Sequence, residues 1–428
     1  METATLIIVL VIAFALFFDF TNGFHDTANA MATPIATGAL KPKVAVLLAA
    51  VLNLFGAFLS TEVAKTISGG IINENQIDDA LFPAIIFAGL IGAITWNMLT
   101  WLLGLPSSSS HALFGGLIGA TIVGVSITAV NFSVVLSKVV LPAVIAPLTA
   151  GIIAFTATRL AYAVTRRYDS KPDGRDGFRW GQIFTSSLVA LAHGTNDAQK
   201  TMGIITLLLI TVGWQTSPEP ETWVVFACAI TIALGTYMGG WRIIRTLGKG
   251  LTDVKPAQGF SAEASTASTI LASSALGFAL STTQVASGSV IGSGLGRRGS
   301  TVRWRTVGRI MIGWLLTLPA SGAVGAAAAG IVVLFDSMDI AWVGILVDAA
   351  LALVVILALF ARSRRNAVTA SNAMSEVADS GTAVRVKRNP PPTRRQRAIA
   401  RDEARRVAAA EAAARKASKK GSQGGSAK

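Results

Sequence analysis

Long apolar runs dominate the first 361 residues of the chain. Ten of them approach the roughly 20 residues that a helix needs to cross the hydrocarbon core of a bilayer, and an eleventh is about half that length. The ten runs are 4–20, 44–60, 81–103, 112–130, 134–163, 182–212, 223–241, 261–280, 306–335 and 340–361, and the short one is 285–295. They predict an all-α polytopic membrane protein with about 11 transmembrane helices, in a range of about 10 to 12.

Basic residues are concentrated at the end of the chain. Of the formal net charge of +14, residues 362–428 carry +12 and residues 1–361 only +2. The body is therefore nearly neutral and apolar, which argues against nucleic acid as a partner and favours the lipid bilayer. The tail contains few large apolar side chains, so we expect a mostly disordered basic cytoplasmic segment, with a transient helix between about 393 and 416.

The charges of the loops orient the predicted helices. Lys and Arg accumulate on the cytoplasmic side of membrane proteins. Basic loops lie at 41–43, 166–179, 242–255 and 297–305, and acidic loops lie at 62–79, 217–221 and 336–339. If each run crosses once, all the basic loops share one face with the tail, and only Lys138 departs from the pattern. The pattern predicts a multi-pass protein of the plasma (inner) membrane with its N-terminus outside and its C-terminal tail in the cytoplasm.

Two motifs recur in the second half of the chain. Residues 22–31 read NGFHDTANAM and residues 193–202 read HGTNDAQKTM, whereas 108–111 read SSSH and 281–284 read STTQ. The loops that follow equivalent motifs carry opposite charge, which indicates two inverted-topology repeats. We expect repeat 1 at 1–163, a cytoplasmic linker at 164–181, repeat 2 with one extra helix at 182–361, and the tail at 362–428.

Charged and amide side chains interrupt the apolar runs at both copies of the first motif. A charged Asp at the bilayer centre costs roughly 2.5 to 3.5 kcal/mol on insertion scales, so Asp26 and Asp197 should face the protein interior or a watery cavity. Gly23, Pro34 and Gly38 favour broken helices at the membrane midplane. The alternative is that these polar groups cap helix ends at the interface.

The two aspartates have oxygen-rich neighbours, and such oxygens suit hard cations or a transferable proton. The residues predicted to couple a cation or proton are Asp26, Asn29, Asn196, Asp197, Asn22 and His25. Asp26 and Asp197 would be metal ligands if Na⁺ or a divalent cation is bound. Lys200 stands where the first motif has Asn29, on the same helical face as Asp197. It can neutralise Asp197, replace one bound cation, bind an anion, or form a plain internal salt bridge.

Hydroxyl side chains gather where two glycine-rich helices are expected to begin. Hydroxyl and backbone N–H groups at a helix N-terminus favour a tetrahedral oxyanion, although serines there also serve as ordinary helix caps. The residues predicted to bind the anion are Ser108, Ser109, Ser110, Ser281, Thr282, Thr283 and Lys200.

All three histidines of the chain fall inside these motifs. His25, His111 and His193 can titrate near neutral pH, or simply pack and form hydrogen bonds. Their scattered positions, without a carboxylate at metal-ligand spacing, do not predict a zinc site. Glu263 and Asn53, inside apolar runs, are weaker candidates for function.

The motifs NGFHDTANAMAT, AHGTNDAQKTMG, LPSSSSHALFGG and LSTTQVASGSVIG resemble those of the inorganic phosphate transporter (PiT) family, particularly its bacterial low-affinity members. The resemblance implies an inverted-repeat secondary transporter that moves phosphate, in some members as a neutral divalent metal phosphate, with H⁺ or Na⁺, as a homodimer. On this basis Asp26, Asn29, Asn196 and Asp197 are implied on the cation side, and the two hydroxyl clusters on the phosphate side. His25, where Asn is usual, together with Lys200, favours H⁺ over Na⁺.

The function expected from the sequence is import of inorganic phosphate by alternating access, driven by a cation gradient rather than a nucleotide. We expect no enzymatic activity and no cofactor other than the coupling cation. The alternatives are a sulfate permease of the same fold, a membrane-embedded enzyme acting on phosphorylated lipids, and a membrane-tethered nucleic-acid binder.

Overall fold

The computed structural model describes residues 2–68, 81–165, 176–365 and 367–373, and within them the chain is all-α, as predicted. The helices are α1 (Glu2–Ala36), α2 (Pro42–Gly56), α3 (Glu62–Ser68), α4 (Phe82–Leu103), α5 (Ser109–Gly124), α6 (Phe132–Val134), α7 (Leu141–Thr165), α8 (Asp176–Thr211), α9 (Thr222–Met238), α10 (Trp241–Arg245), α11 (Pro256–Ala275), α12 (Thr282–Gly296), α13 (Trp304–Asp336) and α14 (Ala341–Arg365). Short 3₁₀ and π-helical turns join some of them, and Thr252 and Val302 form an isolated β-bridge. The predicted helix at 393–416 and the rest of the tail beyond 373 lie outside the described residues.

Within the described residues, five helical segments are long and apolar enough to cross a membrane. They are Thr5–Ala36, Phe82–Leu103, Phe132–Thr165, Trp304–Asp336 and Ala341–Arg365. A sixth results if α9 and the segment Trp241–Gly250, which meet at a bend of 57°, form one span. The remaining predicted runs are shorter as helices or carry more polar residues. For example, α5 has only 16 residues, and α8 carries the polar second copy of the first motif.

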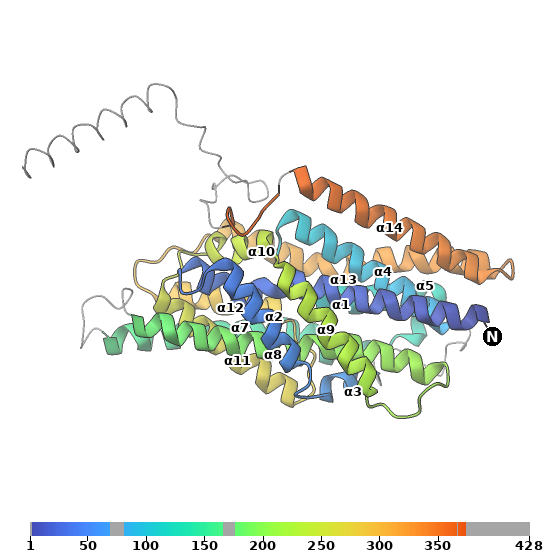
Figure 1. The fold of residues 1–428 in the computed structure, drawn as a ribbon, viewed down its shortest axis with the longest axis horizontal. Coiled ribbons are helices and arrows are strands. Elements are labelled where there is room, and N and C mark those ends of the chain that lie inside the picture. The colour runs from blue at the N-terminus through green and yellow to red at the C-terminus, as the bar shows by residue number, and fades with distance from the viewer. Residues whose placement is uncertain (1, 69–80, 166–175, 366, 374–428) are drawn as a thin grey trace, which may run out of the picture. The chain divides into compact units, whose positions relative to one another are not determined.

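The membrane-length helices differ in how much of their surface the protein covers. In the most apolar part of α4, 83% of the residues are buried, compared with 22% in Phe132–Thr165 and in α14. Figure 1 shows α14, in orange, lying along α4 and α13. Its exposed face carries Leu353, Val354 and Leu357. Helix α4 is thus a central element, whereas α7 and α14 present apolar surface of the kind that lipid covers.

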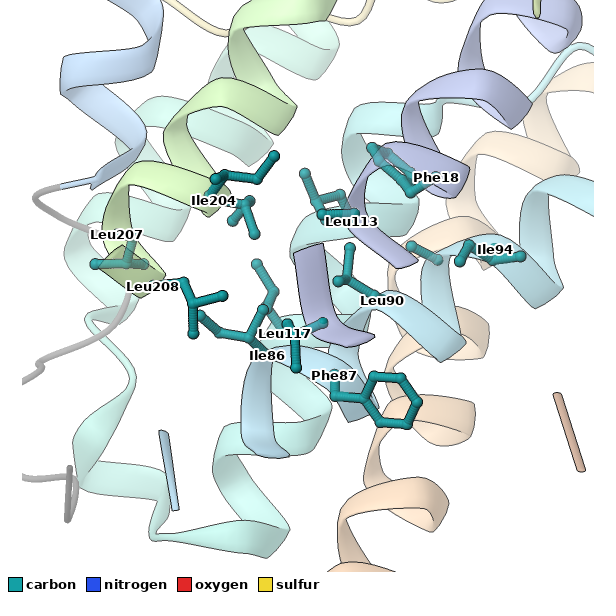
Figure 2. Packing of buried hydrophobic residues seen from close by; sticks show 14 of the residues in the cluster. Phe18, Ile86, Phe87, Leu90, Ile94, Leu113, Leu117, Ile204, Leu207 and Leu208 are labelled. Atoms are coloured by element: carbon teal, nitrogen blue, oxygen red, sulfur yellow. The ribbon is translucent and has the colours of Figure 1, made fainter. Parts of the chain in front are cut away.

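The largest apolar cluster lies between α1, α4, α5 and α8. Figure 2 shows side chains from these four helices meeting, among them Phe18, Leu90, Leu113 and Ile204. Phe18, Leu90 and Leu113 are completely buried. These contacts hold the two helices that carry the first motif, α1 and α8, against the helix that follows the serine cluster.

The helices that carry the first motif are continuous. A break near Gly23 was expected, but α1 runs unbroken from Glu2 to Ala36 with Pro34 inside its last turns, and Gly38 turns the chain after the helix at a φ of 75°. Helix α8 is likewise continuous through Asp197. The reason is packing: α1 and α8 are supported on several sides by other helices, which compensate for the polar and helix-breaking residues. The chain is instead irregular just before α5 and α12.

Corresponding helices of the two halves make corresponding contacts. Helix α1 packs on α9 and α8 packs on α2, and a Cβ added at Gly23 or at Gly194 would overlap the backbone of that neighbouring helix. In the same way α5 packs on α13 and α12 on α7, through Gly119 and Gly292. Small residues at these contacts allow the backbones to approach closely. Each half therefore completes the packing of the other.

The basic segment at 242–255, expected as a loop, is partly helical and partly buried. Arg245 on α10 is 1% exposed. It donates hydrogen bonds to the backbone oxygens of Ala373 (3.2 Å) and Asn372 (2.9 Å), and Arg242 donates to that of Ser363 (2.9 Å). Helix α14 thus extends past the predicted start of the tail at 362, and the chain that follows it packs on α10.

An ion pair joins two of the predicted acidic loops. Lys65 on α3 lies 2.8 Å from Glu219, which precedes α9, and 3.2 Å from Glu62. The three side chains are exposed or nearly so, and each carboxylate raises the pKa of Lys65, with Glu219 contributing most. Lys65 in turn lowers the pKa of Glu219. Helix α3, at the start of the first of these segments, and Glu219 in the second therefore lie at the same end of the helix bundle.

Candidate functional site

The aspartates of the two motifs meet at one buried hydroxyl. Thr282, the first residue of α12, lies with its Oγ1 2.8 Å from Asp197 Oδ2 and 3.4 Å from Asp26 Oδ2. Asp26 is 2% exposed and Asp197 1%. The two residues are 171 positions apart in the sequence, so the fold rather than any local pattern brings them together, as the repeat predicted.

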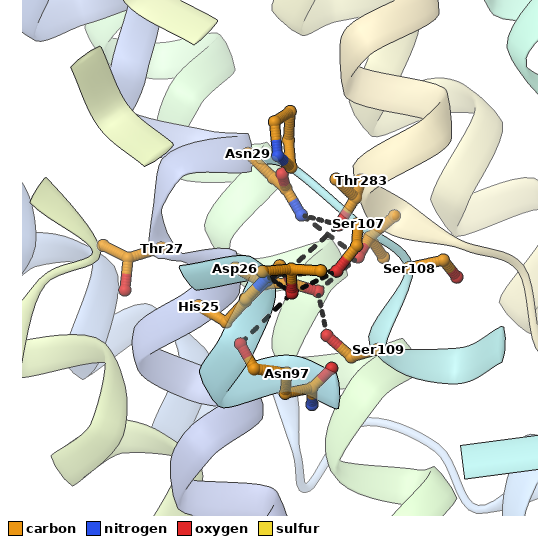
Figure 3. Close-up of polar contacts among 12 residues, drawn as sticks. His25, Asp26, Thr27, Asn29, Asn97, Ser107, Ser108, Ser109 and Thr283 are labelled. Atoms are coloured by element: carbon orange, nitrogen blue, oxygen red, sulfur yellow. Dashed lines mark hydrogen bonds and ion pairs between the residues drawn. The ribbon is translucent and has the colours of Figure 1, made fainter. Parts of the chain in front are cut away.

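Both hydroxyl clusters contribute to the same site. Ser109 donates to Asp26 Oδ2 (3.2 Å) and Thr283 donates to Asp26 Oδ1 (3.0 Å). Figure 3 shows Ser109 and Thr283 approaching Asp26 from different helices. Ser110 instead donates to the backbone oxygen of Leu280 (3.3 Å). Hydroxyls at the N-termini of α5 and α12 therefore converge on one carboxylate, where both helix dipoles point their positive ends.

The first residue of each cluster is a helix cap. Ser108 accepts a hydrogen bond from the backbone N–H of His111, and Ser281 accepts one from that of Gln284. The capping alternative therefore holds for these two residues, which satisfy N–H groups at the helix ends. The side chains of His111 and Gln284, equivalent in the two halves, lie 3.4 Å apart. The two helix N-termini are thus direct neighbours.

His25 connects Asp26 to the end of α4. Its Nδ1 lies 2.6 Å from Asp26 Oδ1, and its Nε2 lies 3.3 Å from the hydroxyls of both Thr100 and Ser107. The buried Asn97, one turn before Thr100, has no hydrogen-bond partner for its side-chain amide among the described residues. Asn97 was not predicted from the sequence, although an amide inside an apolar run was the available signal.

His193 lies closer to the carboxylates than its sequence position suggested. Its Nε2 lies 2.8 Å from Asp197 Oδ2 and 4.0 Å from Asp26 Oδ2, and its Nδ1 lies 3.3 Å from Asn53 Oδ1. His193, Asp26 and Asp197 thus form a buried group whose ligand atoms could hold a metal ion. The expectation that no carboxylate stands at metal-ligand spacing from a histidine was wrong. The spacing of four residues from His193 to Asp197 was the signal for it.

The position three residues after each aspartate differs between the motifs. Lys200 forms an ion pair with Asp197 Oδ1 and donates to the backbone oxygen of Leu280 (3.0 Å). Asn29 donates through Nδ2 to the hydroxyls of Thr283 (3.1 Å) and Thr282 (3.3 Å). Its Oδ1 is buried without a hydrogen-bond partner among the described residues.

The other two amides of the predicted set lie in different surroundings. Asn196 donates to Ser274 Oγ (2.9 Å) and to the backbone oxygen of Phe278 (3.3 Å), both near the end of α11. Asn22 is completely buried, and in the described part of the chain neither side-chain atom has a hydrogen-bond partner. Asn196 therefore ties α8 to α11, while Asn22, one turn before Asp26, keeps its donor and acceptor available.

Two further buried carboxylates, Asp19 on α1 and Glu263 on α11, flank the site. Asp19, which accepts a hydrogen bond from Thr201 (3.0 Å), precedes Asp26 by two helical turns, or about 10 Å. Thr33 follows Asp26 by the same distance and donates to Glu263 on α11. Asp19 was not among the predicted site residues, and Glu263 was a weaker candidate. Both stand apart from the group around Thr282.

Comparison with known proteins identifies the family. The model of the phosphate transporter family matches residues 22–325. The chain belongs to this family. Within the phosphate transporter family, a relative from Mycobacterium bovis named "Probable low-affinity inorganic phosphate transporter" is 52% identical over 374 residues, covering 87% of this chain and 88% of its own. A relative of the same name from Bacillus subtilis is 41% identical over 332 residues, covering 77% and 98%.

A solved structure entitled "The sodium-dependent phosphate transporter" has the same fold. It matches with a TM-score of 0.68 and 25% identity, covering 77% of this chain and 99% of that chain. Together with the apolar helices, membership of the phosphate transporter family makes this chain a multi-pass membrane protein.

The formal charge of the site in this phosphate transporter family member, counted with His25 and His193 neutral, is negative. Asp26 and Asp197 contribute −2 when ionised, and Lys200 contributes +1. Among the described residues, Lys200 is the only lysine or arginine paired with either carboxylate. A buried net charge of this sign is costly unless a cation or a proton joins it.

Proposed function

We propose that the chain is a secondary active transporter that imports inorganic phosphate across the plasma membrane by alternating access. H⁺ is the coupling ion that we favour and Na⁺ the alternative. One observation carries the proposal: carboxylates from both motifs and hydroxyls from both clusters converge around Thr282. The names of the relatives supply the substrate, inorganic phosphate.

The charge of the site explains why the anion would need a coupling cation. With Asp26, Asp197 and Lys200 the buried site already has a formal charge of −1, and a phosphate anion would make it more negative. Bringing unlike charges in together avoids that cost. Phosphate would therefore enter only with protons or cations, or as a neutral divalent metal phosphate, with Asp26 and Asp197 as the ligands of any metal ion.

The hydrogen bonds of the site suggest how binding of the coupling cation and binding of phosphate are linked. The hydroxyls of Ser109, Thr282 and Thr283 donate to the aspartates. A cation or proton on the carboxylates would take over that role and release these donors for the oxygens of phosphate. The phosphate side would then consist of these three hydroxyls with Ser110 and the charge of Lys200, while Ser108 and Ser281 hold the helix ends in place.

The exchange of conformations would follow from the two repeats. We propose that the halves are inverted in topology, which is supported by their motifs, their loop charges and the corresponding helix contacts. The N-terminus would lie outside and the tail in the cytoplasm, and the ion pair of Lys65 with Glu219 supports a common side for two acidic loops. We further propose assembly as a homodimer, as the family resemblance implies.

The test is uptake of labelled phosphate by the full chain in proteoliposomes with an imposed pH or Na⁺ gradient. We expect accumulation with one of the two gradients, competition by arsenate, and none by sulfate. Asp26→Asn should abolish the response to the gradient, and Ser268→Ala, which changes an exposed hydroxyl of α11, is the matched control. Phosphate entry that responds to neither gradient would refute the proposal, and competition by sulfate but not arsenate would favour a sulfate permease.

A further inference from the structure

Lys200 and Asn29 occupy equivalent positions with different chemistry. Each follows the aspartate of its motif by three residues and so shares a helical face with it. Lys200 is 1% exposed and Asn29 is 8% exposed. Because both positions are buried beside a carboxylate, the replacement of an amide by an ammonium changes the charge of the site and not merely its surface.

The surroundings of the Lys200 ammonium are those of a bound cation. Its Nζ contacts a carboxylate oxygen of Asp197 and the backbone oxygen of Leu280 at 3.0 Å. The same backbone oxygen accepts from Ser110 (3.3 Å), and the other oxygen of Asp197 accepts from Thr282. Carboxylate and carbonyl oxygens are the ligands that hard cations use in proteins. The ammonium thus occupies an oxygen cage beside the second hydroxyl cluster.

Among the described residues, no lysine is paired with the aspartate of the first motif. Asp26 is paired with His25, and the remaining contacts of its carboxylate within hydrogen-bond distance are hydroxyls from Ser109, Thr282 and Thr283. Asn29 directs its Nδ2 to the same two threonines, and its buried Oδ1 has no hydrogen-bond partner in the described part of the chain. A buried amide oxygen without a partner, on the same helical face as the carboxylate three residues before it, is a cation ligand in type.

We propose that Lys200 is a built-in cation that fills one of two equivalent cation positions, so that only the position at Asp26 binds an exchangeable cation. The ligands of that cation, a proton or an alkali ion, are the Asp26 carboxylate, Asn29 Oδ1 and the hydroxyl oxygen of Thr283. The proposal rests on the transport function proposed above and specifies its coupling. The chain then couples phosphate to one cation fewer than a site with two asparagines would.

The decisive experiment compares Lys200→Asn with Lys200→Met in the full chain. Asn restores the residue of the first motif and offers an oxygen to a second cation, whereas Met removes the charge and offers none. Phosphate uptake into proteoliposomes is measured against Na⁺ concentration at fixed pH with the proton gradient dissipated. We expect Lys200→Asn to acquire a dependence on Na⁺ with a Hill coefficient about one higher than that of the unchanged chain, because one more site must fill. Lys200→Met should be inactive at every Na⁺ concentration.

The reciprocal variant gives a second and independent readout. Asn29→Lys supplies a built-in cation to both positions, so gradient-driven accumulation should disappear while exchange of phosphate for phosphate across the membrane continues. The proposal is overturned if Lys200→Asn and Lys200→Met behave alike, or if Asn29→Lys still accumulates phosphate on a cation gradient. Failure of the unchanged chain to transport phosphate under any gradient would instead refute the proposed function.

Discussion

The first motif on α1 and its copy on α8 have similar backbone packing but differ in charge. Both helices run continuously through the motif, and both use a glycine, Gly23 or Gly194, to pack closely on a helix of the other half. Yet Asp26 is surrounded by His25 and hydroxyls, whereas Asp197 is neutralised by Lys200. The two motifs thus provide two similar positions, and at one of them a lysine pairs with the carboxylate.

The largest difference between the two motifs is expected when their aspartates are replaced. Asp197→Asn leaves the ammonium of Lys200 buried without its counterion, a change that costs about 3 to 5 kcal/mol in proteins. Asp26→Asn removes a carboxylate whose other partners are hydroxyls and His25, so the fold should tolerate it better. We expect Asp197→Asn to yield little folded protein in size-exclusion chromatography of detergent extracts, and Asp26→Asn to yield a normal amount.

A double variant sharpens this first prediction. Asp197→Asn combined with Lys200→Met removes both charges, and folded protein should return even though gradient-driven uptake does not. Equal yields of the two single aspartate variants would contradict the asymmetry that we infer from the ion pair.

The hydroxyls should show the next largest effect. Thr282 contacts both carboxylates and Ser110 contacts neither, so Thr282→Val should impair phosphate uptake more than Ser110→Ala. Loss of a hydrogen bond to a charged group costs about 1.5 to 3 kcal/mol, which corresponds to about a 10- to 100-fold rise in the phosphate concentration needed for half-maximal uptake. Initial uptake rates over a range of phosphate concentrations measure it, and an equal change in both variants would argue against a bridging role for Thr282.

A smaller effect, on the unfolding temperature, is expected from removing the segment that Arg245 binds after α14. Arg245 donates to the backbone of residues 372 and 373, and unsatisfied buried polar groups cost about 1 to 3 kcal/mol each. Truncation after Arg365 should therefore lower the unfolding temperature in detergent by a few degrees. Truncation after Ala373 retains these contacts, so it should leave both stability and uptake unchanged. Equal unfolding temperatures for the two truncations would show that the contacts do not matter.

The smallest effect is expected at the ion pair that links the two halves on the surface. Lys65 and Glu219 are solvent-exposed, and such pairs contribute little and are screened by salt. Because Lys65 lowers the pKa of Glu219, its contribution is present at neutral pH and lost as the pH falls through that lowered pKa. Glu219→Gln should thus leave uptake unchanged and alter the unfolding temperature only slightly at neutral pH. A difference that persists in acid would point to another cause.

The sequence predicted that polar side chains of the two motifs lie together, whereas their roles in binding and the number of membrane-crossing helices stay predictions. Each aspartate and each hydroxyl cluster belongs to a short repeated pattern that is visible in the sequence alone. Asp26, Asp197, Thr282 and Thr283 could therefore be singled out without a structure. Apolar length alone could not distinguish a lipid-facing helix such as α14 from a polar, protein-covered one such as α8, because burial decides which polar residues a helix can carry.

The residues that the sequence analysis missed depend on contacts between distant elements. The contact of His193 with Asp26 and that of Thr100 with His25 exist only because α8 and α4 pack on α1. Similarly, α1 continues through Gly23 because neighbouring helices pack against it. Helix propensity, which depends on local sequence alone, does not include this packing.

By itself the sequence determined the chemistry of this protein: an apolar helical body, two copies of each polar motif, and a lysine in the second copy where the first has Asn29. Only the tertiary structure decided which hydroxyls contact each aspartate, because residues 83 to 257 positions away in the sequence supply the hydroxyl partners of Asp26 and Asp197. In lipid, polar groups need partners from within the protein, and those partners are chosen by the packing of helices against one another.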